Sequence, residues 1–526
     1  MKKIFSFLAA TLCALTPLFA QAPAIEWQNT IGGNDADFLF SLQQTADGGY
    51  ILSGSSTSNI SGDKTENCLG NWDYWVVKLD ATGSILWQNT IGGIGLDRLE
   101  SIQQTLDGGY ILGGYSTSNI SGDKTENSQG YEDYWVVKLD ALGGIQWQNS
   151  IGGSNGDQLI DLQQTSDGGY ILGGHSQSNI SGDKTENGLG EDDFWVVKLD
   201  ATGTIQWQNT ISGNKSDRLY SIQQTVDGGY ILGGASLSNI SSDKTENCLG
   251  GNDFWVVKLD ATGFIQWQNT IGGTLFDTML SVQQTADGGY ILGGFSYSNI
   301  SGDKTENCLG HPDYWVVKLG ATGTIEWQNT IGGNDEDYLQ HLQQTADGGY
   351  ILGGYSYSNI SGDKTENSWG MEEDFWVVKL DATGTIQWQK TIGGTETDRL
   401  YSLQQTSDGG YILGGLSDSN ISGNKTENCF GSWDYWVIKL APETVPTGEA
   451  PTTLEGITIY PNPTADILSV RSETATTLCL RNAFGQVLST PTIQGQGEID
   501  LSGYPNGIYF LMEMETGIGH KIVKNK

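Results

Sequence analysis

Short apolar or alternating stretches, each bounded by glycine, aspartate or asparagine, recur along most of this chain. The first group of four comprises Trp27 to Ile31, Leu39 to Thr45, Tyr50 to Ser56 and Tyr74 to Leu79. Runs of this length that are rich in β-branched and aromatic residues predict β-strands. The fourth run, Y-W-V-V-K-L, is apolar on both faces, which is typical of a sheet packed between two other sheets.

The same group of four predicted strands returns seven times. A T-x-D-G-G-Y hairpin turn separates the second and third strands of every copy, and L-D-A-T-G or a close variant precedes the next copy. Repetition of a four-stranded unit predicts an all-β, seven-bladed β-propeller over residues 21–441. Each copy opens on a W-Q segment, with a spacing of sixty residues except for one additional residue in the sixth copy: Trp27, Trp87, Trp147, Trp207, Trp267, Trp327 and Trp388.

The two ends of the array predict how it closes. The first Trp segment precedes the first hairpin and has no partner before it, whereas the last copy ends at Leu440 with Pro442 after it. The N-terminal strand can therefore complete the last blade, which removes the free sheet edges. An open solenoid is the alternative, although solenoids ordinarily carry atypical capping repeats.

Antiparallel connectivity places the short turns on one face of the array and the long links on the other. The copies differ most in those long links, just before the D-(Y/F)-W strand. Aromatic side chains there suggest a site for a sugar or a peptide, and shielding of the blade end is the alternative. The candidates are Trp72, Tyr131, His311 and Trp433, with Trp369 in the longer sixth copy.

The long link also repeats S-N-I-S-G-D-K-T-E-N. Asp63, Thr65 and Asn67 offer oxygens at alternate positions, as in some calcium loops. Lys64 lies within the loop, and the seventh copy has Asn424 in place of the aspartate. Local turns in which these side chains bond their own backbone explain the same residues without a metal. No other cofactor is expected.

Four cysteines occupy one repeat position in copies one, four, five and seven. In a closed ring they form two neighbouring pairs, Cys68 with Cys429 and Cys248 with Cys308. An oxidising destination would permit these disulfides if the backbones approach closely enough.

Composition narrows the destination and the partners. Residues 1–20 combine Lys2 and Lys3 with an apolar run and a small residue at Ala20, which predicts a signal peptide and no transmembrane segment after its cleavage. Sixty-two acidic residues stand against 26 basic ones, a formal charge of −36. That balance argues against nucleic-acid binding, which needs clustered lysine and arginine.

The C-terminal residues follow a different pattern. A proline- and threonine-rich linker spans 442–454, and short alternating strands in 455–526 predict a small β-sandwich. This segment resembles the type A C-terminal sorting domain of bacterial type IX secretion cargo. The resemblance implies export by the type IX machinery to the outer cell surface or the medium, and it rests chiefly on Tyr460, Pro461, Asn462, Pro463, Gly485, Gln486, Gly507, Tyr509 and Lys521.

The repeats themselves resemble those of secreted bacterial β-propellers that carry D-G-G-Y-I-L and D-(Y/F)-W-V-V-K-L-D. Such folds host binding, scaffolding and catalysis alike. The near-identity of the copies leaves little unique chemistry beyond His175 and His341, each found in a single copy, and no catalytic constellation is recognisable. We therefore expect a non-enzymatic binding or adhesion module for a glycan or surface protein. The alternatives are a passive surface scaffold and a polysaccharide-acting enzyme.

Overall fold

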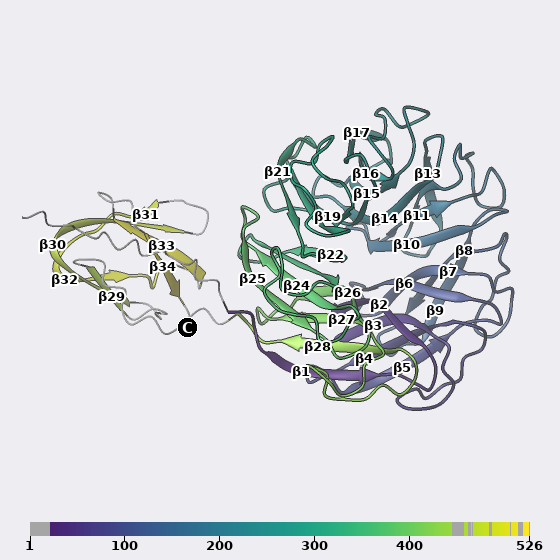
Figure 1. The fold of residues 1–526 in the computed structure, drawn as a ribbon, viewed down its shortest axis with the longest axis horizontal. Helices are drawn as coiled ribbons and strands as arrows, with labels where there is room; N and C mark the ends of the chain where they lie inside the picture. The colour runs from purple at the N-terminus through teal and green to yellow at the C-terminus, as the bar shows by residue number, and fades with distance from the viewer. Residues whose placement is uncertain are drawn as a thin grey trace, which may run out of the picture. The chain divides into compact units, whose positions relative to one another are not determined.

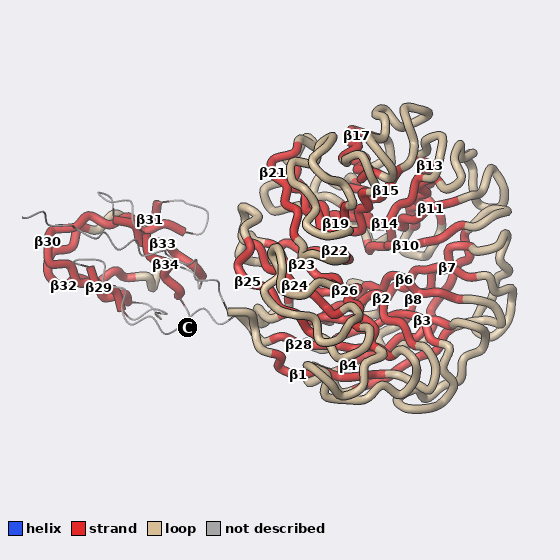
Figure 2. Tube along the Cα trace, in the orientation of Figure 1, coloured by secondary structure: helices blue, strands red, loops and turns tan. Residues whose placement is uncertain are grey.

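A computed structural model describes residues 21–443, 457–460, 464, 467–482, 487–504, 507–513 and 519–524. The secondary structure of these residues is β throughout, and the chain divides into two compact units, Met1–Glu443 and Thr444–Lys526. The predicted signal peptide and nearly all of the predicted linker lie outside the described residues. Figure 1 shows the ribbon, and Figure 2 shows how strands alternate with loops.

The first unit consists of repeated four-stranded antiparallel sheets of the kind found in propeller blades. We number these four-stranded sheets 1 to 7 in chain order, refer to each as a blade, and write each in the strand order of its sheet, starting with the strand that lines the cavity described below. Their strands are β2 (Asp37–Gln44), β3 (Tyr50–Ser56), β4 (Asp73–Leu79) and β5 (Ile85–Ile91); β6 (Asp97–Gln104), β7 (Tyr110–Ser116), β8 (Asp133–Leu139) and β9 (Ile145–Ile151); β10 (Asp157–Gln164), β11 (Tyr170–Ser176), β12 (Asp193–Leu199) and β13 (Ile205–Ile211); β14 (Asp217–Gln224), β15 (Tyr230–Ser236), β16 (Asp253–Leu259) and β17 (Ile265–Ile271); β18 (Asp277–Gln284), β19 (Tyr290–Ser296), β20 (Asp313–Leu319) and β21 (Ile325–Ile331); β22 (Asp337–Gln344), β23 (Tyr350–Ser356), β24 (Asp374–Leu380) and β25 (Ile386–Ile392); and β26 (Asp398–Gln405), β27 (Tyr411–Ser417), β28 (Asp434–Leu440) and β1 (Ile25–Ile31).

The N-terminal strand belongs to the last of these sheets. β1 pairs antiparallel with β28, with Ile31 opposite Tyr435. Blade 1 also packs against blade 7, because Leu39 and Trp75 share one buried cluster with Tyr435 and Val437. The two ends of the repeat array therefore meet.

The two middle strands of each blade are buried along almost their whole length because they pack between neighbouring sheets; Phe295 in β19 and Tyr355 in β23 are the half-buried exceptions. Tyr74 of blade 1 and Trp135 of blade 2 show how that interface is built. Their rings lie 4.7 Å apart, and the Tyr74 hydroxyl donates to the Trp135 carbonyl at 3.0 Å. A satisfied hydrogen bond of this kind contributes about 1 kcal/mol and fixes the register between blades.

Turns and long links lie at opposite ends of the strands. At one end, Gly48 adopts a φ of 84°, which its hairpin turn requires, and Lys78 pairs with Asp47 at 3.0 Å. At the other end, Lys64 of the long link is buried, donates to Thr90 and lies 4.9 Å from the centre of the Trp75 ring. This is the polarity expected from the sequence.

The second unit is a separate set of antiparallel strands built around one long strand, β30 (Ile467–Asn482). β29 (Ile457–Tyr460) and β32 (Thr492–Asp500) pair with its first half, although β32 also reaches Thr477. β31 (Val487–Ser489) and β33 (Gly507–Glu513) pair with its second half, and β34 (Gly519–Lys524) pairs with β33.

Candidate functional site

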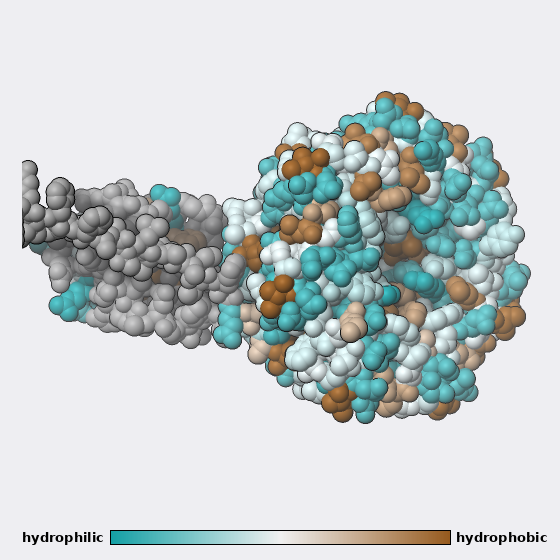
Figure 3. Space-filling model, in the orientation of Figure 1, coloured by the Kyte–Doolittle hydropathy of each residue, from teal (hydrophilic) through white to brown (hydrophobic). Residues whose placement is uncertain are grey.

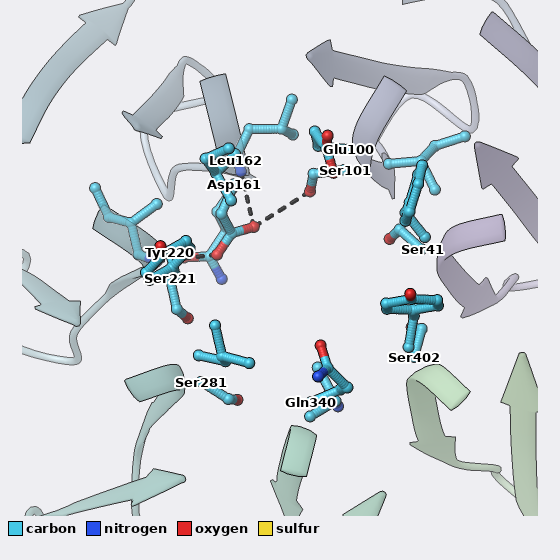
Figure 4. A pocket seen from close by; sticks show the side chains of 18 of the residues that line it. Ser41, Glu100, Ser101, Asp161, Leu162, Tyr220, Ser221, Ser281, Gln340 and Ser402 are labelled. Carbon is cyan, nitrogen blue, oxygen red and sulfur yellow. Dashed lines mark hydrogen bonds between the residues drawn. The ribbon is translucent and has the colours of Figure 1, made fainter. Parts of the chain in front are cut away.

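The innermost strands of all seven blades line one cavity of about 680 Å³. Figure 4 shows side chains from separate sheets pointing toward its centre, among them Ser41, Tyr220 and Gln340. The rest of the visible surface of the first unit is largely hydrophilic, with hydrophobic residues scattered over it (Figure 3). The cavity is therefore the place where the seven copies meet.

The wall of this cavity is where the copies diverge. Within β2, Asp37, Leu39 and Leu42 are buried between blades, whereas the intervening residues face inward and are only half-buried. Position 40 of the first copy has six different residue types among its seven equivalents. These are Phe40, Glu100, Ile160, Tyr220, Leu280, Gln340 and Tyr401, and all seven line the cavity.

Beside this variable layer lies a uniform ring of glutamines. The Gln43 Oε1 atom accepts a hydrogen bond from the backbone N–H of Gln104 in the next blade at 2.7 Å. The same contact joins every neighbouring pair of blades, including blade 7 to blade 1 through Gln404 and Gln44. The seven ring members are Gln43, Gln103, Gln163, Gln223, Gln283, Gln343 and Gln404, with distances of 2.5 to 2.7 Å.

Serines form a second ring, which two copies interrupt. The Ser402 Oγ accepts from the backbone N–H of Leu42 at 3.2 Å, and Ser221 and Ser281 do the same for their next blades. Asp161 and His341 stand at this position in blades 3 and 6. The ring is thus broken by one acid and one imidazole.

Asp161 is held by hydrogen bonds rather than by a cation. It accepts from the Ser101 hydroxyl at 3.2 Å, as Figure 4 shows, and from the backbone N–H of Ile222 at 2.9 Å. Burial raises the pKa of Asp161 to about 6, because desolvation outweighs these bonds.

The two histidines of the cavity are neutral at physiological pH. Burial lowers the pKa of both His175 and His341 to about 4. The His175 Nε2 lies 3.1 Å from the Gln158 side-chain oxygen, and both Nδ1 atoms lack a hydrogen-bond partner among the described residues. Neither imidazole touches a candidate nucleophile within that part of the chain.

Three arginines stand at one repeat position, two of which, Arg98 and Arg218, line the cavity, and each of the three is already paired. Arg98 Nε lies 2.6 Å from Glu100, and Arg218 Nε lies 2.9 Å from Asp192 of the preceding blade. Arg399 pairs with Glu373, also of the preceding blade. The charged rim is therefore neutralised pair by pair.

A row of aromatic rings runs along blades 5, 6, 7 and 1 and reaches the cavity at Phe40 and Tyr401. Phe38 lies between Trp72 and Trp433, with ring centres at 4.9 and 6.1 Å. The row continues over ring-centre distances of 4.9 to 6.4 Å, and we call it the aromatic arc. Its members are Trp72, Trp433, Phe38, Phe40, Tyr401, Tyr355, Tyr338 and Phe295.

The structure brings together only two of the five aromatic or histidine candidates. Trp72 and Trp433 directly precede their strands and flank Phe38. Tyr131 and His311 stand one residue farther from their strands and are exposed, so they are not equivalent to Trp72 and Trp433. They do not join the aromatic arc.

Trp369 also lies apart from this arc. Its indole Nε1 donates to Asn424 of blade 7 at 2.9 Å, and its ring covers Gly423. Leu69 covers the equivalent glycine, Gly122, so Trp369 fills a structural position of the repeat. The shielding interpretation applies to this tryptophan.

The three calcium candidates bond their own surroundings. The Asn67 Oδ1 accepts from the backbone N–H of Ile60, and the Asp63 carbonyl accepts from the Gln88 amide. The backbone N–H of Thr65 donates to the same Gln88 side chain. Over the described residues, no group of three or more histidine, cysteine, aspartate or glutamate side chains is arranged to hold a metal ion.

The expected disulfides are absent, and this corrects the sequence-based pairing. Cys68, Cys248, Cys308 and Cys429 are free thiols. Each Sγ donates to a serine carbonyl of its own blade, as Cys68 does to Ser56 at 2.8 Å and Cys429 to Ser417 at 3.0 Å. Burial raises the pKa of the Cys68 thiol to about 12, so it is also unreactive.

Sequence reasoning missed the cavity wall itself. The copies differ in the loops, but positions 38 and 40 of the innermost strand vary as strongly. The signal was available, because residues 37, 39 and 42 to 44 hardly change between copies while 38 and 40 do. A period of two in that variation indicates one exposed face of a strand.

Some sorting-domain residues can be placed in the second unit. Tyr460 ends β29, Gly507 begins β33, and Lys521 lies in β34 opposite Phe510. Tyr509 is buried in the core of this unit. Pro461, Asn462, Pro463, Gly485 and Gln486 lie outside the described residues.

Comparisons with known proteins give distant matches for the repeats. The chain is 23% identical over 385 residues to the regulatory protein FlaEY of Caulobacter vibrioides, covering 67% of this chain and 40% of that protein. The chain thus spans less than half the length of this relative. Within the part of the chain that the structure describes, there is no helix long and apolar enough to cross a membrane.

Solved structures resemble the chain only loosely. Puromycin hydrolase matches at a TM-score of 0.44 with 11% identity, covering 86% of this chain and 61% of that one. PorZ, a surface component of the type IX secretion system of Porphyromonas gingivalis, matches at 0.36 with 11% identity, covering 96% and 61%. At these scores the likeness carries no argument about function.

The C-terminal match is of a different kind. The family described as the secretion system C-terminal sorting domain matches residues 458–525, which include most of the second unit and the motif residues above. This domain marks proteins exported by type IX secretion to the cell surface or outside the cell. Residues 458–525 of this chain therefore belong to the secretion system C-terminal sorting domains.

Proposed function

We propose that the chain is an exported, non-enzymatic binding protein whose repeats form a closed seven-bladed β-propeller and whose ligand site is the central cavity. The pairing of β1 with β28 and the glutamine contact from blade 7 to blade 1 support closure. The second unit, in which one long strand serves two groups of partners, is a small β-sandwich that engages the type IX machinery.

One observation carries the binding proposal. Near-identical copies diverge at positions 38 and 40, which face the cavity and its rim, while the neighbouring buried positions stay uniform. Blade packing needs no such difference, because the same core works in every blade. Side chains that break the repeat around one cavity make a single asymmetric site, as a specific ligand requires.

The test removes two aromatic rings at the cavity. Phe40 and Tyr401 come from blades 1 and 7, their ring centres lie 5.5 Å apart, and both line the cavity. The double variant Phe40→Ala/Tyr401→Ala should lose binding to surface-derived polysaccharide or protein while its melting temperature stays within a few degrees. Trp369→Leu is the matched control, since it changes an aromatic residue outside the cavity. Equal binding by all three proteins would refute the proposed site.

An enzyme acting on polysaccharide is the second candidate, and one observation favours it. Glu100 and Asp161 both line the cavity, and burial raises the pKa of each. Carboxyl groups with raised pKa serve as general acids in glycoside hydrolysis. Release of new reducing ends by the wild type, lost in Asp161→Asn, would establish catalysis; unchanged chain length supports the binding function.

A further inference from the structure

In the glutamine ring, the side-chain oxygens are hydrogen-bonded but the side-chain amino groups are not, and this difference determines what the cavity wall can bind. Each ring Oε1 is used by the backbone N–H of the next blade, which fixes which end of the carboxamide is oxygen. None of the seven Nε2 amino groups has a hydrogen-bond partner among the described residues, although all seven glutamines line the cavity. The wall therefore presents a ring of side-chain amino groups that can donate, while the oxygens of the same side chains already accept a backbone hydrogen bond.

The serine ring adds to the same asymmetry. The oxygens of Ser221, Ser281 and Ser402 accept backbone N–H groups from the next blades. The hydroxyl hydrogens of Ser281 and Ser402 have no acceptor among the described residues and are free to donate, whereas the Ser221 hydroxyl donates to Asp161. The glutamine ring and the adjacent serine ring thus both offer hydrogen-bond donors, which a ligand with oxygen acceptors would satisfy.

Charge decides what kind of acceptor fits. The arginines of the rim are each paired with a carboxylate, so the wall has no unneutralised cation to attract an anion. Asp161 adds an acid to the wall, and the whole chain carries a formal charge of −36. An anionic ligand would be repelled by this field.

The aromatic arc indicates that the ligand also has an apolar face. Flat rings such as Phe40 and Tyr401 give contact area to a ligand with an apolar face. Arg98 lies 4.5 Å from the Phe40 ring centre, so this ring is supported from one side. A ligand that stacks on aromatic rings and accepts many hydrogen bonds without charge is a neutral sugar.

We infer that the cavity binds one end of a neutral oligosaccharide, with a sugar ring against the aromatic arc and its oxygens accepting from the glutamine and serine rings. This inference rests on the proposed binding function and specifies its ligand class. Uncharged oxygens of hydroxyl and ring groups match donors of this kind without the desolvation cost of a charged group.

A pair of isosteric variants separates the donor from its structural role. Gln43→Glu keeps the oxygen that accepts from Gln104 but removes the free amino group. Gln44→Glu makes the same change one residue along, where Oε1 accepts from Ser407 at 2.8 Å and the side chain is not part of the cavity wall. Both variants add one negative charge, so only the position differs.

The experiment uses the full mature chain on an array of neutral glucan, xylan and mannan oligosaccharides beside uronate-bearing and sulfated ones. We expect retention of a neutral oligosaccharide, weakened at least about fivefold by Gln43→Glu and unchanged in Gln44→Glu, since one hydrogen bond is worth about that factor. Equal affinity of the two variants for that sugar would overturn the inference.

The other outcomes are equally decisive. Binding of only acidic polysaccharides, or of a protein, that is lost in Phe40→Ala/Tyr401→Ala would overturn the neutral-sugar inference and leave the proposed cavity function intact. Binding to no probe of any class would overturn both.

Discussion

Every interface between neighbouring blades buries two aspartates, and their titration sets how stability depends on pH. Asp374 begins β24, Asp398 begins β26 of the next blade, and both are fully buried. The Oδ1 atom of each has no hydrogen-bond partner among the described residues. Burial, with a contribution from Asp398, raises the pKa of Asp374 to about 7, and burial raises that of Asp398 to about 6.

The sign follows from comparing folded and unfolded states. A carboxyl whose folded pKa is raised stabilises the fold when protonated, so its contribution is present at low pH and is lost as pH rises through the folded pKa. Asp374 has a folded pKa of about 7 and an unfolded pKa near 3.9. Raising the pH from 5 to 7.5 therefore lowers the free energy of unfolding by about 2.5 kcal/mol through this group. For a group with a pKa of about 6, such as Asp73 or Asp133, the loss is about 1.4 kcal/mol.

Other charged groups around Asp374 limit the useful pH range. Lys364 lies nearby, and burial lowers its pKa to about 8, so its titration acts in the opposite direction at higher pH. Glu373 is paired with Arg399, and Glu366 accepts a backbone N–H from Thr391. Measurements between pH 5 and 7.5 therefore report mainly the aspartates.

The assay is chemical denaturation of the wild type and Asp374→Asn at pH 5, 6, 7 and 7.5. The wild type should be most stable at pH 5, and the variant should lose up to about 2.5 kcal/mol less over this range. Glu372→Gln, an exposed carboxylate two residues upstream, should keep the wild-type slope. Stability that is flat or rises with pH in the wild type would refute the reasoning.

Three further predictions concern closure, the thiols and Trp369. Deleting Ile25–Ile31 leaves the β28 edge unpaired, so size-exclusion chromatography should show aggregation and melting should fall by several degrees; a monomer with wild-type melting contradicts closure by β1. Cys68→Ser should change stability by less than about 1 kcal/mol, because Ser128 makes the same contact in copy two, and intact mass without reductant should show no disulfide; a mass two hydrogens lower would contradict this. Trp369→Leu should keep ligand binding, since leucine fills this position in other copies; lost binding would place the site on the loops.

The strand pattern was predictable because the repeat presents each strand seven times in the same context. The predicted strand Tyr50 to Ser56 matches β3, and Tyr74 to Leu79 differs from β4 by one residue. Apolar residues on both faces of the stretch Tyr74 to Leu79 indicate burial between two sheets, and this signal can be read from the stretch itself. The turn at Gly48 was equally legible, since a positive φ there calls for glycine.

The site was harder to predict because it depends on contacts between copies. Trp433 contacts Phe38 only because blades 7 and 1 are neighbours, and the sequence pattern within one copy does not predict that contact. Tyr131 and His311 stand two residues before the first aspartate of their strands and Trp72 stands one residue before it, so their side chains occupy different positions of the link. The free thiols were not predictable for a different reason: each cysteine Sγ donates to a serine carbonyl of its own blade, and residue spacing alone does not reveal that contact.

The stoichiometry of binding tests the account most directly. Seven equivalent loops would offer seven sites, whereas a single asymmetric cavity offers one. Isothermal titration of the mature chain with the neutral oligosaccharide it retains best should give one site per chain, abolished in Phe40→Ala/Tyr401→Ala. About seven sites per chain, unaffected by that double variant, would contradict the proposal that the cavity is the ligand site.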